Sequence, residues 1–275
     1  MILTLSDTYR FPSGKPMADA VAKLFALQGR ETIRQLAGQQ FVSLSNWNDY
    51  FADKLFPYFL WHAAEGWRFQ RGRLQRATNP AILPDWSAKS MFYKAKRTST
   101  EESEDTDRRK WLLLLLGLFD EDVVADIRAM VRRQVAFINQ TTTKRVNAIL
   151  QAYQLSIARG DPWTRADLNQ KLRAVFLDDK RALLIGEDES MRAFHFGMLR
   201  VLEDSRLEWE KTWRTAADEK VCPVCMPLDG KTVALGESFV SGDTIAFAPP
   251  IHGHCRCRLS FKAVVVQSVR ELLGA

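Results

Sequence analysis

The stretch CPVCMPLDGK, residues 222–231, places two cysteines two residues apart and directly before an Asp-Gly turn. The chain of 275 residues has only two other cysteines, Cys255 and Cys257, in the segment HGHCRC, residues 252–257. No cysteine precedes residue 222. Cysteines used only as small core residues would be scattered along the chain, so their clustering indicates a shared task.

Three tasks fit such a pair. Redox catalysis needs a βαβ context with the first cysteine at a helix N-terminus. Here the pair follows a predicted helix, a predicted strand and a short turn, and no helical pattern resumes after it. Disulfides are disfavoured in a reducing compartment, although a particle released from a cell would later meet oxidant. Metal binding is the interpretation that we favour, and thiols packed without an ion remain the alternative to it.

The spacing of the donors suits zinc, which takes four nitrogen or sulfur ligands from two short knuckles. Cys222 and Cys225 form the first knuckle, and His252, Cys255 and Cys257 supply the second. Three thiolates with the imidazole of His252 would complete a tetrahedron, and so would all four thiolates. If the protein fills all four positions, Zn²⁺ is structural, and its binding supplies folding free energy to a loop-rich segment.

The residues before the cysteines are predicted to be mainly helical. Apolar side chains recur at helical spacing, and Pro57 is expected to kink or break the second helix. Thr164 and Asp167 predict an approximate capping box at one helix start, and Gly160 predicts a helix end. The predicted helices cover residues 17–38, 46–70, 120–140 with a continuation to 160, 164–177 and 179–204.

The pattern changes to period two in RLEWEKTWRT, residues 206–215. Trp209, Lys211 and Trp213 alternate with polar residues, which predicts a strand. The segment RLSFKAVVVQ, residues 258–267, is the expected pairing strand. The fold class is therefore α+β: an extended, mainly helical N-terminal region, then a small α+β C-terminal domain with a C-x-x-C…H-x-x-C-x-C zinc-type site.

Four regions are predicted along the chain. The segment KRTSTEESEDTDRRK, residues 96–110, has no apolar side chain beyond the threonine methyls and is expected to be a flexible linker. It separates a helical N-terminal region, residues 1–95, from a second helical region, residues 111–178. Residues 179–275 form the predicted C-terminal domain.

Charge and hydropathy indicate which partners and which compartment suit the protein. The formal net charge of +6 and the pI near 9.2 favour an acidic partner, such as nucleic acid or an acidic protein surface. The most apolar run, WLLLLLGLF at residues 111–119, has about half the length that a bilayer requires. The N-terminus shows no secretory signal pattern. We therefore expect no membrane association and folding in a cytoplasm, where thiols stay reduced.

The motif residues together resemble the phage Mu F-like minor head proteins, also called the phage head morphogenesis domain. The resemblance covers about residues 180–260. In the upstream helix, Glu189 matches the family's glutamate, whereas Asp188 stands where threonine is usual. The matching residues are Trp213, Thr215, Asp218, Cys222, Pro223, Cys225, Leu228, Asp229, Gly230, Lys231, Pro249, Pro250, His252, Cys255, Arg256 and Cys257.

The resemblance implies a minor, low-copy structural protein of a tailed bacteriophage head, multimeric in the particle. It implies association with the portal protein and the capsid interior, and packaged double-stranded DNA is a further candidate partner. The expected location is the virion, at the head interior or the portal vertex, after synthesis in the host cytoplasm. No catalysis is implied by the motif.

The alternative function is a zinc-containing, nuclease-like enzyme that processes DNA. A hydrolytic site needs an open metal position and a nearby general base. Glu189, Asp218 and Asp229 are candidate bases, but their spacing does not bring them together. Asp229-Gly230 is better explained as a turn, and His195 as a packed helix residue.

Overall fold

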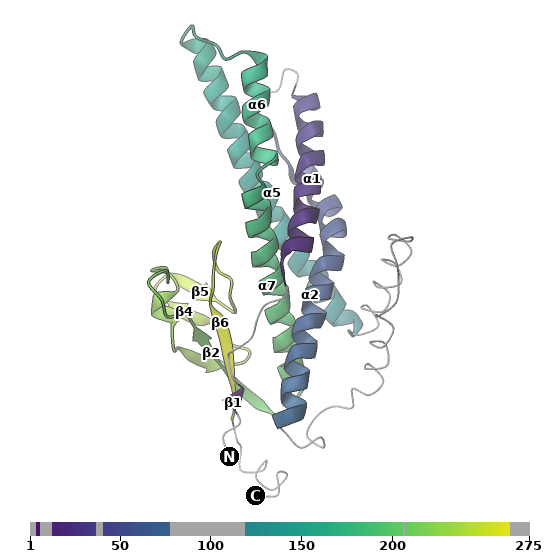
Figure 1. Ribbon diagram of the computed structural model, residues 1–275, viewed down its shortest axis with the longest axis vertical. Coiled ribbons are helices and arrows are strands. Elements are labelled where there is room, and N and C mark those ends of the chain that lie inside the picture. The colour runs from purple at the N-terminus through teal and green to yellow at the C-terminus, as the bar shows by residue number, and fades with distance from the viewer. Residues whose placement is uncertain (1–3, 6–12, 37–40, 78–118, 206, 265–275) are drawn as a thin grey trace, which may run out of the picture. The chain divides into compact units, whose positions relative to one another are not determined.

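The computed structural model describes residues 4–5, 13–36, 41–77, 119–205 and 207–264. The predicted α+β class is confirmed, since long helices come first and the main strands follow toward the C-terminus (Figure 1). The predicted linker, residues 96–110, lies outside the described residues, as does most of WLLLLLGLF. None of the described helices is long and apolar enough to span a bilayer.

Contacts between residues divide the chain into two compact units, and helices α2 and α7 have residues in both. The helical unit consists of Ser13–Phe59 and Asp122–Glu187. The second unit, here called the strand unit, consists of Met1–Pro12, Leu60–Glu121 and Asp188–Ala275. The predicted boundary at residue 179 stays a prediction.

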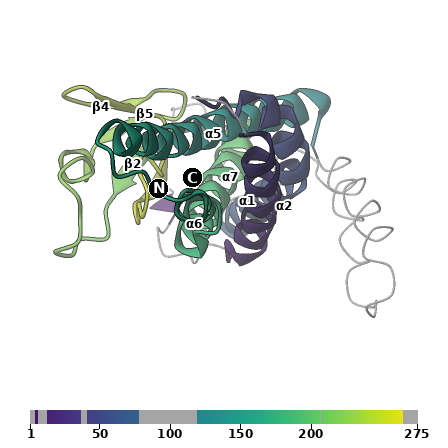
Figure 2. The ribbon, with the colours of Figure 1, turned by 90° about the horizontal axis from the view of Figure 1, so that it is seen from above.

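The helical unit is built from amphipathic helices. In both views α1 and α6 lie side by side (Figures 1 and 2), and Gly29 lets α1 approach the ring of Phe176. Helix α5 buries the predicted stripe that includes Ile127 and Ile138, with Val135 in the core. The helices that contribute are α1 (Lys15–Gln35), α2 (Asn48–Ala77), α5 (Glu121–Ala158), α6 (Arg165–Phe176) and α7 (Asp179–Glu203), with a short 3₁₀ helix at Ser45–Trp47.

Local signals placed several helix ends correctly. The hydroxyl of Thr164 accepts a hydrogen bond from the backbone N–H of Asp167, and the carboxylate of Asp167 accepts one from the N–H of Thr164. This confirms the capping box at α6. Gly160 has φ +79 just beyond the end of α5. Helix α2 does not end at Pro57, because the buried Phe56 and Phe59 on either side stabilise the helix across the lost hydrogen bond.

The strand unit contains a four-stranded antiparallel sheet in the order β1-β6-β2-β3 and a separate β4–β5 hairpin. The predicted pairing of the two long strands is confirmed, with Trp209 opposite Ala263 and Trp213 opposite Leu259. All four of these side chains are buried. The strands are β1 (Thr4–Leu5), β2 (Glu208–Arg214), β3 (Thr232–Ala234), β4 (Phe239–Ser241), β5 (Thr244–Ala246) and β6 (Arg258–Val264).

Strand β2 also buries Lys211 on the same face as the two tryptophans. Its Nζ lies 3.2 Å from the ring centroid of Phe247, a cation–π contact, and burial lowers the pKa of Lys211 to about 8. The ring of Phe239 packs edge-on against Trp213 with centroids 5.3 Å apart. These contacts hold the β4–β5 hairpin beside β2, where both views place it (Figures 1 and 2).

Helices α2 and α7 meet closely inside the strand unit because each contributes a glycine. A Cβ on Gly66 would collide with the carbonyl oxygen of Phe194, and one on Gly197 would collide with that of Ala63. The C-terminal part of α7 is thereby fixed against α2. This part of α7 faces the loop that leads into the second cysteine knuckle.

Candidate metal centre

The first knuckle is a tight turn between β2 and β3. The backbone N–H of Cys225 donates to the carbonyl oxygen of Cys222 at 3.1 Å and lies 3.3 Å from its Sγ. The N–H of Met226 donates to the same carbonyl at 3.0 Å and opens the short 3₁₀ helix η4 (Met226–Leu228). Burial alone would raise the pKa of Cys222, but hydrogen bonds from the turn lower it overall.

The second knuckle immediately precedes β6 and brings the other three predicted donors to the first. Cys222, Cys225 and His252 form one triad, and Cys225, Cys255 and Cys257 form another. Within each triad the ligand atoms lie within 4.8 Å of one another. Cys225, Cys255 and Cys257 are buried, whereas Cys222 and His252 are half-buried. The fold therefore gathers all five predicted side chains around Cys225.

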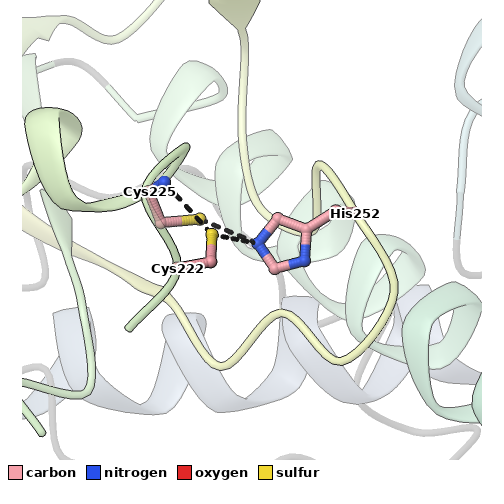
Figure 3. Close-up of side chains that lie close together, drawn as sticks. All are labelled: Cys222, Cys225 and His252. Carbon is pink, nitrogen blue, oxygen red and sulfur yellow. Dashed lines mark hydrogen bonds between the residues drawn. The ribbon is translucent and has the colours of Figure 1, made fainter. Parts of the chain in front are cut away.

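The imidazole of His252 points its Nε2 at the first knuckle (Figure 3). The Nε2 atom lies 2.9 Å from the Sγ of Cys222 and 3.1 Å from that of Cys225. On the other side of the ring, Nδ1 lies 2.7 Å from the carbonyl oxygen of Gly253 and donates to it. This hydrogen bond leaves the lone pair of Nε2 directed at the two sulfurs, which is the tautomer that a metal ligand requires.

The donor set fits a soft or borderline ion such as Zn²⁺. With Zn–S distances of about 2.3 Å, two sulfurs of a tetrahedral site lie about 3.8 Å apart. The Sγ atoms of Cys225 and Cys255 are 4.0 Å apart, and all four cysteines are free. A disulfide would need about 2.05 Å. The residues present therefore suit an ion better than a cross-link.

Cys255 and Cys257 differ in electrostatic character. A hydrogen bond from the side chain of Cys257 lowers the pKa of Cys255 to about 5, whereas the pKa of Cys257 is raised by the same bond and by burial. Burial raises the pKa of Cys225 to about 12. The two shifts have opposite directions because the two thiols contact each other, and both remain candidate ligands beside Cys222, Cys225 and His252.

Helix α7 positions the second knuckle through polar contacts that the sequence did not reveal. Arg192 donates to the carboxylate of Glu189 at 3.0 Å and to the carbonyl oxygen of Pro250 at 3.1 Å. The buried His195 contacts the carbonyl oxygen of Pro249 through Nδ1 at 2.9 Å. The Pro-Pro segment lies two residues before His252, so α7 holds the loop that aims the imidazole. His195 is a packed helix residue, as predicted.

A second contact joins the two knuckles directly. The two terminal nitrogens of the Arg256 guanidinium, Nη1 and Nη2, donate to the two carboxylate oxygens of Asp218, each at 2.6 Å. Asp218 precedes the first knuckle, and Arg256 lies between the two cysteines of the second. This bidentate pair lowers the pKa of Asp218. An acidic residue beside one knuckle and a basic residue beside the other are visible in the sequence. Because they are 38 positions apart, the sequence alone does not predict that they pair.

The remaining motif residues shape the turn or lie away from the donors. Asp229 accepts a hydrogen bond from the N–H of Thr215 at 2.8 Å, and Gly230 has φ +73, so Asp229-Gly230 is a turn as predicted. His254 is exposed and belongs to neither triad. Asp188 is half-buried beside the cluster, and burial, with the charges of Glu189 and Cys255, raises its pKa to about 7.

Comparison with known proteins gives one match. Residues 147–260 match the family model described as Phage Mu protein F like protein. No curated protein matches the chain, and no solved structure does. The match begins in α5, upstream of residue 180 where the sequence resemblance starts, and it ends in β6 just after the cysteine cluster. Over residues 147–260 the chain is therefore similar to the phage Mu protein F like family, the family that the cysteine motif also resembles.

Proposed function

We propose that this protein is a minor structural component of a tailed phage head, bound to the portal and the inner capsid. In this proposal one structural Zn²⁺ binds both cysteine knuckles and stabilises the C-terminal part of the chain. The observation that supports this proposal most is the family match, whose last residues enclose the five-donor cluster. Packaged double-stranded DNA is a second partner in the proposal, because the chain has a formal net charge of +6.

The ion would act by holding two distant loops together. The loop segment between β2 and β6 buries few large side chains, chiefly Leu228 and Phe239. Such a segment gains little free energy from apolar burial, so metal coordination would supply much of its folding free energy. A stable module would present a defined surface to the portal during assembly.

The contacts of the candidate bases favour the structural role over the zinc-enzyme alternative. Glu189 is bound by Arg192, Asp218 by Arg256, and Asp229 by the N–H of Thr215. A hydrolytic site would also need an open metal position. Asp188 is the carboxylate with a raised pKa beside the cluster, so the substitution Asp188→Asn provides the sharpest enzymatic control.

The test is genetic and biochemical. Purified virions should contain the protein at low copy number, and a phage with the gene deleted should produce defective heads. Portal protein immobilised on a surface should retain the purified chain. Plasmid DNA incubated with the zinc-loaded protein should stay intact, with or without Asp188→Asn. Normal heads from the deletion phage, or plasmid cleavage that Asp188→Asn abolishes, would refute the structural role.

A further inference from the structure

The outer face of the β2–β6 ladder places two arginines directly opposite each other. Arg214 pairs in register with Arg258, at the end of the sheet nearest the cysteine cluster, and both side chains are exposed. Like charges in directly opposed positions destabilise an antiparallel pair of strands. A structural role does not account for this arrangement, since it costs stability in the isolated protein.

No acidic side chain among the described residues forms an ion pair with either arginine. The nearest acid on the same face of β2 is Glu210, four residues from Arg214 and therefore about 13 Å away along the strand. Glu210 is itself paired with Lys262, at 3.9 Å. At physiological ionic strength the screening length is about 8 Å, so Glu210 does not neutralise the arginine pair.

Hydroxyl groups surround the arginines on the same face. The next cross-strand pair is Thr212 opposite Ser260, and the Oγ of Ser260 accepts a hydrogen bond from the Nε of Arg214 at 3.3 Å. The hydroxyl of Thr212 also lies 2.8 Å from that of Thr232, which is opposite it on the neighbouring strand β3. Guanidinium and hydroxyl groups together are the side chains that contact phosphate oxygens of a nucleic-acid backbone.

We infer that the Arg214–Arg258 pair is a docking site for the phosphodiester backbone of double-stranded DNA. A phosphate between the two guanidiniums removes their repulsion and replaces it with two charge-assisted contacts. The cross-strand neighbours of the pair on this face are Thr212, Ser260 and Thr232, and none of them is aromatic or aliphatic. Protein–protein interfaces usually have an aromatic or aliphatic centre, so nucleic acid fits these residues better than an acidic protein. Because the site contacts only the backbone, binding is independent of base sequence. This inference rests on the proposed position of the protein beside packaged DNA.

The experiment compares the full-length chain, purified with its metal, with the variant Arg214→Gln/Arg258→Gln. Binding to a 30-base-pair duplex of arbitrary sequence is measured by fluorescence anisotropy between 50 and 200 mM salt. Loss of two phosphate contacts lowers the slope of log K against log salt by about 1.8. Over that range the wild type should therefore lose about twelvefold more affinity than the variant does.

The matched control is Arg159→Gln/Arg165→Gln, which removes two exposed arginines of the helical unit and changes the net charge equally. Its salt slope should equal that of the wild type. Thermal unfolding gives a second readout: Arg258→Gln should melt no lower than the wild type, because the substitution removes a repulsion. The inference would be overturned if the wild type and Arg214→Gln/Arg258→Gln had equal salt slopes. It would also be overturned if the control variant lowered the salt slope as much as Arg214→Gln/Arg258→Gln does. Virion content does not depend on this slope, so the proposed function can stand if the docking site fails.

Discussion

Substitution of Cys225 is the sharpest test of the metal-stapled module, because Cys225 belongs to both donor triads. Cys225 is the donor that the two triads share, so the variant Cys225→Ala removes a ligand from either triad. We expect it to lose the stoichiometric ion that the wild type contains. Metal content by elemental analysis, on protein purified without chelator, measures this directly.

The expected loss of stability follows from the linkage between binding and folding. An ion present at 1,000 times its dissociation constant stabilises the folded state by about 4 kcal/mol. For a unit of the size of the strand unit, each kcal/mol corresponds to about 2 to 4 °C in melting temperature. Cys225→Ala should therefore melt about 8 °C or more below the metal-loaded wild type. Strong chelator should reduce the wild type toward the same value and expose the loops between β2 and β6 to protease.

Val224→Ala is the matched control, since Val224 lies between the two cysteines and its side chain is 46% exposed. This variant should keep the ion and melt within about 0.5 kcal/mol of the wild type. The reasoning fails if the wild type contains no stoichiometric transition metal. It also fails if Cys225→Ala retains one ion per chain, or if chelator leaves the protease pattern unchanged.

Three further outcomes are expected. His252→Ala should weaken metal affinity more than Cys257→Ser does, because Nε2 of His252 lies 2.9 Å and 3.1 Å from the two sulfurs of the first knuckle; competition with a colorimetric chelator ranks the two variants. Burial lowers the pKa of His62 to about 4 and that of His195 to about 3. Both are neutral in the folded state and charged in the unfolded state below about pH 6.5, so stability should fall by up to about 1.4 kcal/mol per pH unit per histidine as pH drops toward 4. Denaturant titrations measure how much the free energy of unfolding falls between pH 7.5 and pH 5.0, and this fall should be smaller for His62→Gln than for the wild type. An equal fall in both proteins would show that His62 is not buried in its neutral form. Gly197→Ala should destabilise the strand unit by about 2 kcal/mol or more, because its Cβ would collide with the backbone of α2; calorimetry that finds wild-type stability would show that the two helices do not meet as described.

The sequence predicted the parts of this protein that depend on near neighbours. The sequence predicts the capping box of Thr164 and Asp167, the turn at Gly230 and the alternation around Trp213, and the structure confirms all three. Each depends on residues within one turn of helix or one strand, so short-range geometry suffices to specify it. The five candidate ligands were also identified, because sulfur donors clustered in one part of the chain are unusual. Pro57 shows the limit of such signals, since burial of its neighbours outweighs its local preference.

Tertiary structure alone decided which distant residues meet. Three contacts join residues that are at least 38 positions apart. They are the hydrogen bond from Arg192 to Pro250, the ion pair of Asp218 with Arg256 and the cross-strand pair of Arg214 with Arg258. No local propensity specifies such pairs, because they follow from the register of β2 on β6 and from the packing of α7. A shift of that register by one residue would end the direct pairing of Arg214 with Arg258 and move one of the two side chains to the other face. The donor types were thus present in the sequence, whereas the site that they form depends on long-range packing.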